Sequence, residues 1–139
     1  MRKNTPIQTV MTTEVATVHL AQPLSAVAEL LRDRGFRHVP VVDGQRPVGM
    51  ISATDVFKLV YDHDGTDERM AAAMIDHEHS IATTMEIELQ TLRESSTVYD
   101  ATVLLASGEF SSVLVVDDAG KLAGLVTTVD LIRFLRDQF

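Results

Sequence analysis

The hydrophobic positions of this chain change their spacing several times along its first half. In the first helical pattern, Leu24, Val27 and Leu31 recur at i, i+3 and i+7, which is typical of one buried helix face. Two continuous apolar runs follow, joined by an Asp/Gly-containing link that is typical of a β-hairpin. The expected order is strand 15–18, helix 23–35, strands 38–42 and 47–51, and helix 54–62.

The second half repeats this order, with expected elements at 89–92, 97–108, 112–116, 122–126 and 129–139. Met11 aligns with Met85 at an offset of 74 residues, and Gly49 aligns with Gly124 at an offset of 75 residues. The extra residue falls in the hairpin link, where a structural repeat tolerates insertion. The sequence therefore predicts an α+β fold made of two pseudo-symmetric β-α-β-β-α repeats.

The middle of the chain has no counterpart after the second half. We expect a helical turn or two at 67–75 and interpret the rest as a linker, which gives repeat 1 at 7–62, a linker at 63–80 and repeat 2 at 81–139. The runs "DHD" at 62–64 and "DHEH" at 76–79 suggest a metal site, since imidazole and carboxylate bind Zn²⁺. Their spacing matches no metal motif, so we interpret them as solvated linker residues and expect no metal.

Composition and charge narrow the function. Hydrophobic residues make up 45% of the 139, enough to form a core, and cysteine is absent, which excludes disulfides and thiolate sites. The net charge of -8 disfavours nucleic acid and anionic membranes as partners. No membrane-length apolar run or secretion signal is present, so we expect a cytoplasmic protein. No nucleophile, Walker or dinucleotide motif is found either, and we expect no enzyme.

One short phrase occurs in both halves, as "VGMISATD" at 48–55 and "AGLVTTVD" at 123–130. Each places a hydroxyl at the end of a strand and a carboxylate three residues later, at the start of a helix. A helix N-terminus favours phosphate, and a carboxylate accepts hydrogen bonds from ribose hydroxyls. Glycines 49 and 124 leave room for a ligand or another backbone. The same spacing also fits a capping box, which is the interpretation that spacing alone favours.

Arg37 and His38 precede the first hairpin strand. Arg37 could hold phosphate through two hydrogen bonds, and His38 would add charge only when protonated. Alternatively, both are solvated residues near the end of a helix, where positive charge is favoured. The second half has Ser111 and Ser112 instead, with Leu114 in place of Pro40, so that a polyphosphate would lack neutralisation there.

The stretches "GFRHVPVVDGQRPVGMISATD" and "GEFSSVLVVDDAGKLAGLVTTVD" resemble a tandem pair of CBS domains, the regulatory unit called a Bateman module. The resemblance implies that the two copies pack through their sheets and that the module dimerises. It also implies binding of AMP, ADP, ATP or S-adenosylmethionine in clefts between the repeats. The implied ligand-binding residues are Val15, Arg37, His38, Val39, Pro40, Ser52, Thr54 and Asp55 for one site, and Leu89, Ser111, Ser112, Val113, Thr127 and Asp130 for the other.

Within these sets the resemblance assigns contacts with the adenine base to Val15 and Val39, and to Leu89 and Val113. For each of these residues plain core packing is the alternative. We expect the Asp55 site to be the better one for a phosphorylated nucleoside, because Arg37 belongs to it.

The sequence is consistent with two functions. The first is a stand-alone sensor of an adenosine-containing ligand, with a regulated protein as a further partner. The second is a ligand-free dimerisation or adaptor module that binds a protein. A homodimer is expected in either case, because the second helix of each half carries more apolar residues than packing against a single surface requires. These residues are Val56, Phe57, Leu59, Val60, Leu131, Ile132, Phe134 and Leu135.

Overall fold

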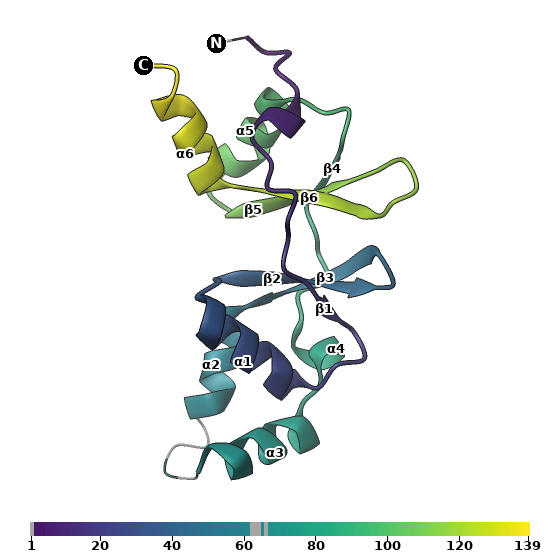
Figure 1. Ribbon diagram of the computed structural model, residues 1–139, viewed down its shortest axis with the longest axis vertical. Coiled ribbons are helices and arrows are strands. Elements are labelled where there is room, and N and C mark those ends of the chain that lie inside the picture. Colours follow the sequence, from purple (N-terminus) through teal and green to yellow (C-terminus); the bar gives the residue numbers. More distant parts are fainter. Residues whose placement is uncertain (1, 62–64, 66) are drawn as a thin grey trace. The chain divides into compact units, whose positions relative to one another are not determined.

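The computed structural model describes residues 2–61, 65 and 67–139, which form two compact units (Figure 1). Unit 2 is Ala16–Glu88. Unit 1 combines the segment up to Val15 with Leu89–Phe139. Each repeat of the sequence therefore begins with a segment that packs in the other unit. The repeat boundaries at 7–62, 63–80 and 81–139 remain a prediction, since the compact units follow spatial contacts and not sequence similarity.

Unit 2 contains a three-stranded sheet in the order β1-β2-β3. Strand β1 pairs parallel to β2, and β2 forms an antiparallel hairpin with β3. Helices cover one face of this sheet (Figure 1). The elements are β1 (Val18–His19), α1 (Leu24–Arg34), β2 (His38–Asp43), β3 (Arg46–Ser52), α2 (Ala53–Tyr61), α3 (Glu68–Glu78) and α4 (Ile81–Thr84).

Unit 1 repeats the same topology, with a sheet in the order β4-β5-β6. The predicted α+β fold of two β-α-β-β-α repeats is confirmed. The first strand of each repeat begins slightly later in the sequence than expected, because pairing with the hairpin starts only there. Val18 is paired with Val41, and Thr91 is paired with Leu114. The elements are η1 (Ile7–Thr9), β4 (Thr91–Arg93), α5 (Val98–Ala106), β5 (Ser112–Val116), β6 (Leu122–Thr127) and α6 (Thr128–Arg136).

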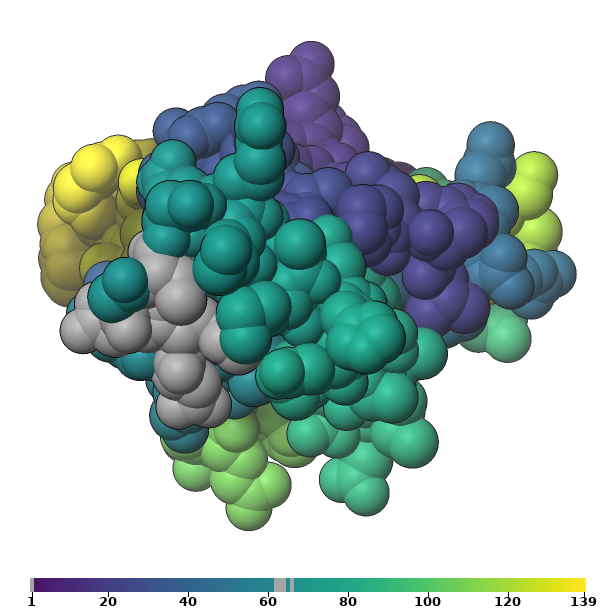
Figure 2. Space-filling view, turned by 90° about the horizontal axis from the view of Figure 1, so that it is seen from below, coloured from purple at the N-terminus to yellow at the C-terminus, as the bar shows by residue number. Residues whose placement is uncertain are grey.

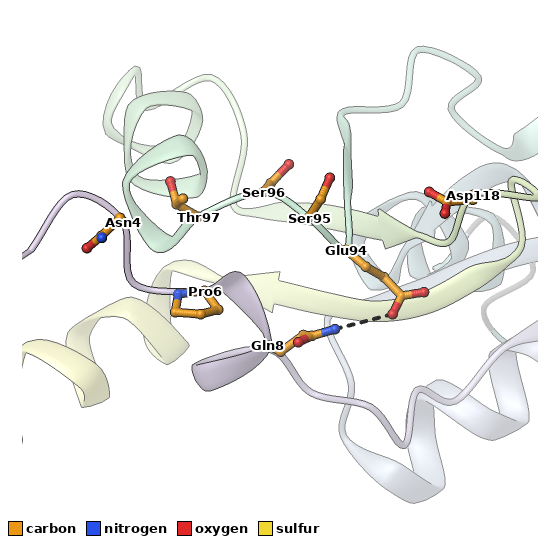
Figure 3. Close-up of a pocket in the computed structure, with 8 residues that line it drawn as sticks. All are labelled: Asn4, Pro6, Gln8, Glu94, Ser95, Ser96, Thr97 and Asp118. Atoms are coloured by element: carbon orange, nitrogen blue, oxygen red, sulfur yellow. Dashed lines mark hydrogen bonds between the residues drawn. The ribbon is translucent and has the colours of Figure 1, made fainter.

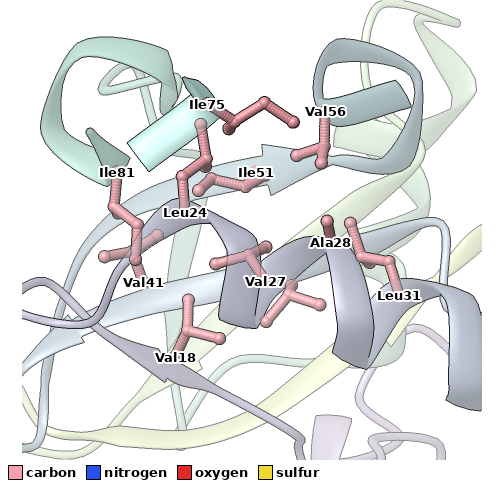
Figure 4. Packing of buried hydrophobic residues seen from close by; sticks show 11 residues of the cluster. Val18, Leu24, Val27, Ala28, Leu31, Val41, Ile51, Val56, Ile75 and Ile81 are labelled. Atoms are coloured by element: carbon pink, nitrogen blue, oxygen red, sulfur yellow. The ribbon is translucent and has the colours of Figure 1, made fainter. Parts of the chain in front are cut away.

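The core of unit 2 forms where the helical stripe of α1 meets the sheet (Figure 4). Helix α1 starts after Pro23 and ends at Gly35, whose φ of 68° is the left-handed conformation that glycine tolerates best. Between these two residues the stripe turns a single face toward the hairpin, as its spacing predicts. The buried side chains are Val18, Leu24, Val27, Ala28, Leu31, Val39, Val41, Ile51, Val56, Ile75 and Ile81.

The core of unit 1 is smaller, and it includes a residue from the start of the chain. Ile7 in η1 is fully buried against α5 and the β5–β6 hairpin. Its backbone N–H donates to the carbonyl oxygen of Ser96 at 3.0 Å. The segment before Val15 is therefore an integral part of this unit. The other buried members are Ala101, Leu105, Val113, Val115 and Val126.

The middle segment, in which a helical turn or two is expected at 67–75, forms helices α3 and α4 in its described residues and belongs to unit 2. Ile75 of α3 and Ile81 of α4 lie in the core, with 2% and 0% of their surface exposed. The carboxylate of Asp76 accepts hydrogen bonds from the backbone N–H of Ser25 at 2.8 Å and from its hydroxyl at 2.6 Å. Figure 2 shows the teal α3 residues lying over the blue atoms of α1.

Each unit also holds a short strap from outside its repeat. In unit 2, Met50 and Glu86 exchange backbone hydrogen bonds of 2.9 and 2.8 Å. In unit 1, Thr12 and Leu125 do the same at 2.8 and 2.9 Å. Within the described ranges, no helix has both the length and the apolar character needed to cross a bilayer.

Candidate functional site

The junction between β3 and α2 brings the basic pair and the repeated phrase together in unit 2. His38 lies opposite Ser52 in the antiparallel register of β2 and β3. The backbone N–H of Ala53, the first residue of α2, donates to the carbonyl oxygen of Arg37 at 2.7 Å. The predicted residues Arg37, His38, Ser52 and Asp55 therefore surround one helix N-terminus. A helix N-terminus carries a partial positive charge.

At this junction the backbone of Asp55 is hydrogen-bonded, whereas its carboxylate, among the described residues, is not. Its backbone N–H donates to the hydroxyl oxygen of Ser52 at 3.1 Å, which is one half of a capping box. Its carboxylate accepts no hydrogen bond from any residue that the structure describes, and the residue is exposed. Both carboxylate oxygens are therefore available to hydroxyl donors on a ligand.

Asp130 of unit 1 is differently placed, although its sequence spacing is the same. Its backbone N–H donates to the hydroxyl oxygen of Thr127 at 3.1 Å, and its carboxylate accepts from the Thr127 N–H at 2.9 Å. Arg133 Nη1 lies 3.9 Å from the other carboxylate oxygen, and only 12% of the Asp130 side chain is exposed. The capping-box interpretation is therefore correct in unit 1, and this carboxylate already has protein partners.

Serines stand at the matching positions of unit 1. The backbone N–H of Thr128 donates to the Ser111 carbonyl oxygen at 3.1 Å, and Ser112 lies opposite Thr127 in the hairpin. The backbone geometry of the two junctions is thus alike, but the positive side chain of Arg37 has no equivalent here. The unit 2 junction is better suited to phosphate because it has Arg37 beside the helix N-terminus.

The remaining predicted residues lie near these junctions in different ways. Val39, Pro40 and Val113 are buried in the strands, with Val39 and Val113 at 0% exposure in the two cores. Thr54 is exposed on the first turn of α2. Leu89 is half-buried at the start of the Leu89–Phe139 part of unit 1. Val15 is also half-buried and belongs to unit 1, whereas Asp55 belongs to unit 2.

The two glycines of the repeated phrase face methionine side chains. A Cβ added at Gly49 would overlap the sulfur of Met85, and one added at Gly124 would lie 2.8 Å from the sulfur of Met11. Sequence reasoning assigned these glycines to the approach of a ligand or of another backbone. The available signal was the alignment of Met11 with Met85 at the repeat offset, which gave no indication of what the side chains contact.

Burial lowers the pKa of His38 below its ordinary value of 6.5, and the nearby Arg37 guanidinium lowers it further. The carboxylate of Asp55 acts in the opposite direction but does not outweigh them. His38 is therefore neutral at pH 7, and Arg37 supplies the positive charge at the junction. A bound phosphate would favour protonation of His38.

We expect this histidine to make the protein less stable in weak acid. Between pH 6.5 and its lowered folded-state pKa, the unfolded chain binds more protons than the folded one, so the free energy of unfolding falls as the pH falls. Urea unfolding at pH 7.5 and 5.5 should show a smaller difference for His38→Gln than for the unsubstituted protein. His77→Gln, at an exposed position, is the control. An unchanged difference in His38→Gln would contradict the assignment.

Two depressions in unit 1 do not include Asp130 in their lining. A polar one of about 430 Å³ is lined by Asn4, Pro6, Gln8, Glu94, Ser95, Ser96, Thr97 and Asp118, and Gln8 donates to the Glu94 carboxylate at 3.3 Å across it (Figure 3). An apolar groove of about 360 Å³ runs between α5 and α6. Neither includes a predicted ligand residue. In the part of the chain that the structure describes, no three His, Asp or Glu side chains are grouped to hold a metal, and "DHD" at 62–64 lies outside that part.

Comparison with known proteins identifies the class. The CBS domain family matches residues 7–62 and 79–137, so this chain belongs to that family as a tandem pair of CBS domains. Among curated proteins, an uncharacterized protein of Methanocaldococcus jannaschii, MJ1232, is 24% identical over 91% of the chain. The inosine-5′-monophosphate dehydrogenase of Haemophilus influenzae is 28% identical over 94% of it. The chain spans 38% and 24% of the length of these two relatives.

Solved structures share the fold. CBSX2, a CBS-pair protein of Arabidopsis thaliana, has been solved in complex with AMP; it is 23% identical with a TM-score of 0.78, over 96% of this chain and 98% of CBSX2. The CBS domain pair of protein MJ0100, in complex with 5′-methylthioadenosine and S-adenosylmethionine, is 23% identical with a TM-score of 0.73, over 94% of this chain and 99% of that pair. These structures show that the chain has the fold of a CBS-domain pair.

Proposed function

We propose that this chain is a non-catalytic regulatory module that binds an adenosine-containing ligand at the β3–α2 junction of unit 2. The observation that carries the proposal is the Asp55 carboxylate, exposed and accepting no hydrogen bond from a described residue, at the N-terminus of α2, where the Arg37 backbone also lies. The carboxylate suits ribose hydroxyls, whereas Arg37 and the helix N-terminus suit phosphate. The cytoplasm is the location that we propose from the sequence.

The ligand class follows from this pairing of groups. The carboxylate of Asp55 repels phosphate, so the phosphate must lie toward Arg37 and the positive end of the α2 dipole, with the sugar on the Asp55 side. A nucleoside that carries both groups satisfies both ends of the junction. The AMP complex of CBSX2 and the S-adenosylmethionine complex of the MJ0100 pair support an adenosine ligand.

At the unit 1 junction we propose weaker binding, or a less charged ligand. Asp130 would have to give up its hydrogen bond with the Thr127 N–H before it could accept one from a sugar. Ser111 and Ser112 can donate hydrogen bonds to phosphate but bring no charge. A ligand such as 5′-methylthioadenosine, which has no phosphate, is the better match for this environment.

Thermal unfolding with and without ligand tests the proposal. AMP, ADP, ATP, S-adenosylmethionine and 5′-methylthioadenosine are each added at millimolar concentration. A ligand that binds the native state raises the midpoint as occupancy rises, and we expect this for at least one phosphorylated nucleoside. If none of the five ligands shifts the midpoint, the adaptor function is favoured instead.

A dimerisation or adaptor role is the second candidate, and α6 favours it. Ile132 and Leu135 are 58% and 36% exposed, beside the apolar groove between α5 and α6. In α2, by contrast, Val56 is buried in the core and Phe57, Leu59 and Val60 pack against it. We therefore propose a homodimer through α6. Sedimentation equilibrium should detect it at micromolar concentration, and Ile132→Glu should shift the equilibrium toward the monomer; a monomer for the unsubstituted chain contradicts it.

A further inference from the structure

Each unit holds its strap through the same pair of contacts. Met85 lies against Gly49 in unit 2, and the next residues of the two segments, Glu86 and Met50, exchange two backbone hydrogen bonds. Met11 lies against Gly124 in unit 1, where the following residues, Thr12 and Leu125, exchange two more. We call each set of a methionine, its glycine and the adjacent bridge a clasp.

The methionine sulfur fills the space that a side chain at the glycine would occupy. A Cβ at Gly49 would lie 2.8 Å from Met85 Cγ and would overlap its sulfur. At Gly124 a Cβ would lie 3.0 Å from the Thr12 carbonyl oxygen as well as against the Met11 sulfur. No additional atom fits between sulfur and strand. Both methionines are half-buried, so part of each side chain also contacts solvent.

The clasps lie on the two stretches of chain that cross between the units. Unit 1 gives way to unit 2 after Val15, three residues beyond Thr12, and unit 2 gives way to unit 1 after Glu88, two residues beyond Glu86. In each crossing, the residue after the methionine forms an isolated two-bond bridge with a strand of the same unit. The contact of the methionine therefore stabilises a short bridge that has no further ladder beside it.

We propose that the two clasps form an oxidation-sensitive device, in which a peroxide converts Met11 and Met85 to the sulfoxide and releases both straps. With hydrogen peroxide, the sulfur lone pair attacks one oxygen and the O–O bond breaks; the proton of the transferred hydroxyl passes to the other oxygen, which leaves as water. The sulfur is oxidised and the peroxide reduced. The product is bulkier and polar, so it fits poorly against a strand backbone that offers no space at that point. This inference does not depend on the ligand proposed above.

The test treats the full chain with hydrogen peroxide, locates the oxidised methionines by peptide mass spectrometry, and follows single amides by hydrogen exchange. Met70, 54% exposed on α3, reports that the peroxide has reacted. Once Met11 and Met85 are oxidised, the amides of Thr12, Met50, Glu86 and Leu125 should exchange at least about tenfold faster, as expected for local opening of a bridge. The Ile51 amide, within the β2–β3 ladder, should be unchanged.

Matched variants distinguish the effect of oxidising the clasp methionines from that of general oxidative damage. Met11→Leu and Met85→Leu keep an apolar side chain without the sulfur, and peroxide should no longer accelerate exchange at the bridge next to the substituted residue. Met70→Leu should behave like the unsubstituted chain. Treatment with methionine sulfoxide reductases should restore slow exchange. The proposal is overturned if Met11 and Met85 resist peroxide that oxidises Met70, if their oxidation leaves the bridge amides slow, or if the leucine variants respond like the unsubstituted protein.

Discussion

Asp55→Ala should weaken binding of a phosphorylated adenine nucleoside by about 10- to 100-fold, because hydrogen bonds to a charged group contribute about 1.5–3 kcal/mol. Asp130→Ala should change the same affinity much less. The reason is the state of the two carboxylates: that of Asp55 is exposed and accepts no hydrogen bond from a described residue, whereas that of Asp130 accepts from the Thr127 N–H at 2.9 Å. Calorimetric titration of both variants measures the difference.

The stability of the same two variants should change in the opposite order. Asp130→Ala removes half of a capping box and a negative charge from the first turn of α6, which costs about 1 kcal/mol of unfolding free energy. Asp55→Ala removes no hydrogen bond made by the carboxylate and should cost less. Urea unfolding of both variants provides the control for the titrations. Equal losses of affinity, or a larger loss for Asp130→Ala, would contradict the assignment of the ligand to unit 2.

Asp76→Ala should lower the free energy of unfolding by about 1–2 kcal/mol. Helix α1 begins after Pro23, which provides no side-chain cap, and the carboxylate of Asp76 from α3 takes that role by accepting from the Ser25 N–H and hydroxyl. The substitution leaves the Ser25 N–H without a partner from α3 and weakens the attachment of α3 to α1. Urea unfolding measures the effect.

A double-mutant cycle with Ser25→Ala tests whether this contact is responsible. Because the hydroxyl of Ser25 donates to Asp76 at 2.6 Å, the two substitutions should cost less together than the sum of their separate effects. Asp33→Ala, an exposed acidic residue on α1, provides the control and should change stability little. Strict additivity of Ser25→Ala and Asp76→Ala would show that the contact contributes nothing in solution.

The sequence contains enough information to predict the repeated topology but not the state of its repeated phrase. Hydrophobic spacing and the hairpin links predict each β-α-β-β-α order, because burial of one face leaves few alternatives. Ser52 to Asp55 and Thr127 to Asp130 have the same spacing, yet one carboxylate is free and the other closes a capping box. The difference lies in the hydrogen bonding of one side chain, which no pattern of residue types specifies.

The sequence predicts less of the middle segment, for a different reason. It has no counterpart in the second half, so the repeat gives no information about it. Local signals were present: Asp67 accepts a hydrogen bond from the Met70 N–H at the start of α3, and Ser80 forms a capping box with Thr83. What could not be predicted is the tertiary part, namely the insertion of Ile75 and Ile81 into a core formed by residues far earlier in the chain.

The exchange of the two straps also affects how the protein can fold during synthesis. Unit 2 is complete once Glu88 has left the ribosome, and by then the segment with Ile7 and Met11 has been made but has no hairpin to pack against. That first segment therefore stays unpaired until β5 and β6 have been translated. Dividing the gene between its repeats would give two fragments that each lack part of their own core. The duplicated sequence suggests two separable halves, whereas each half needs core residues from the other.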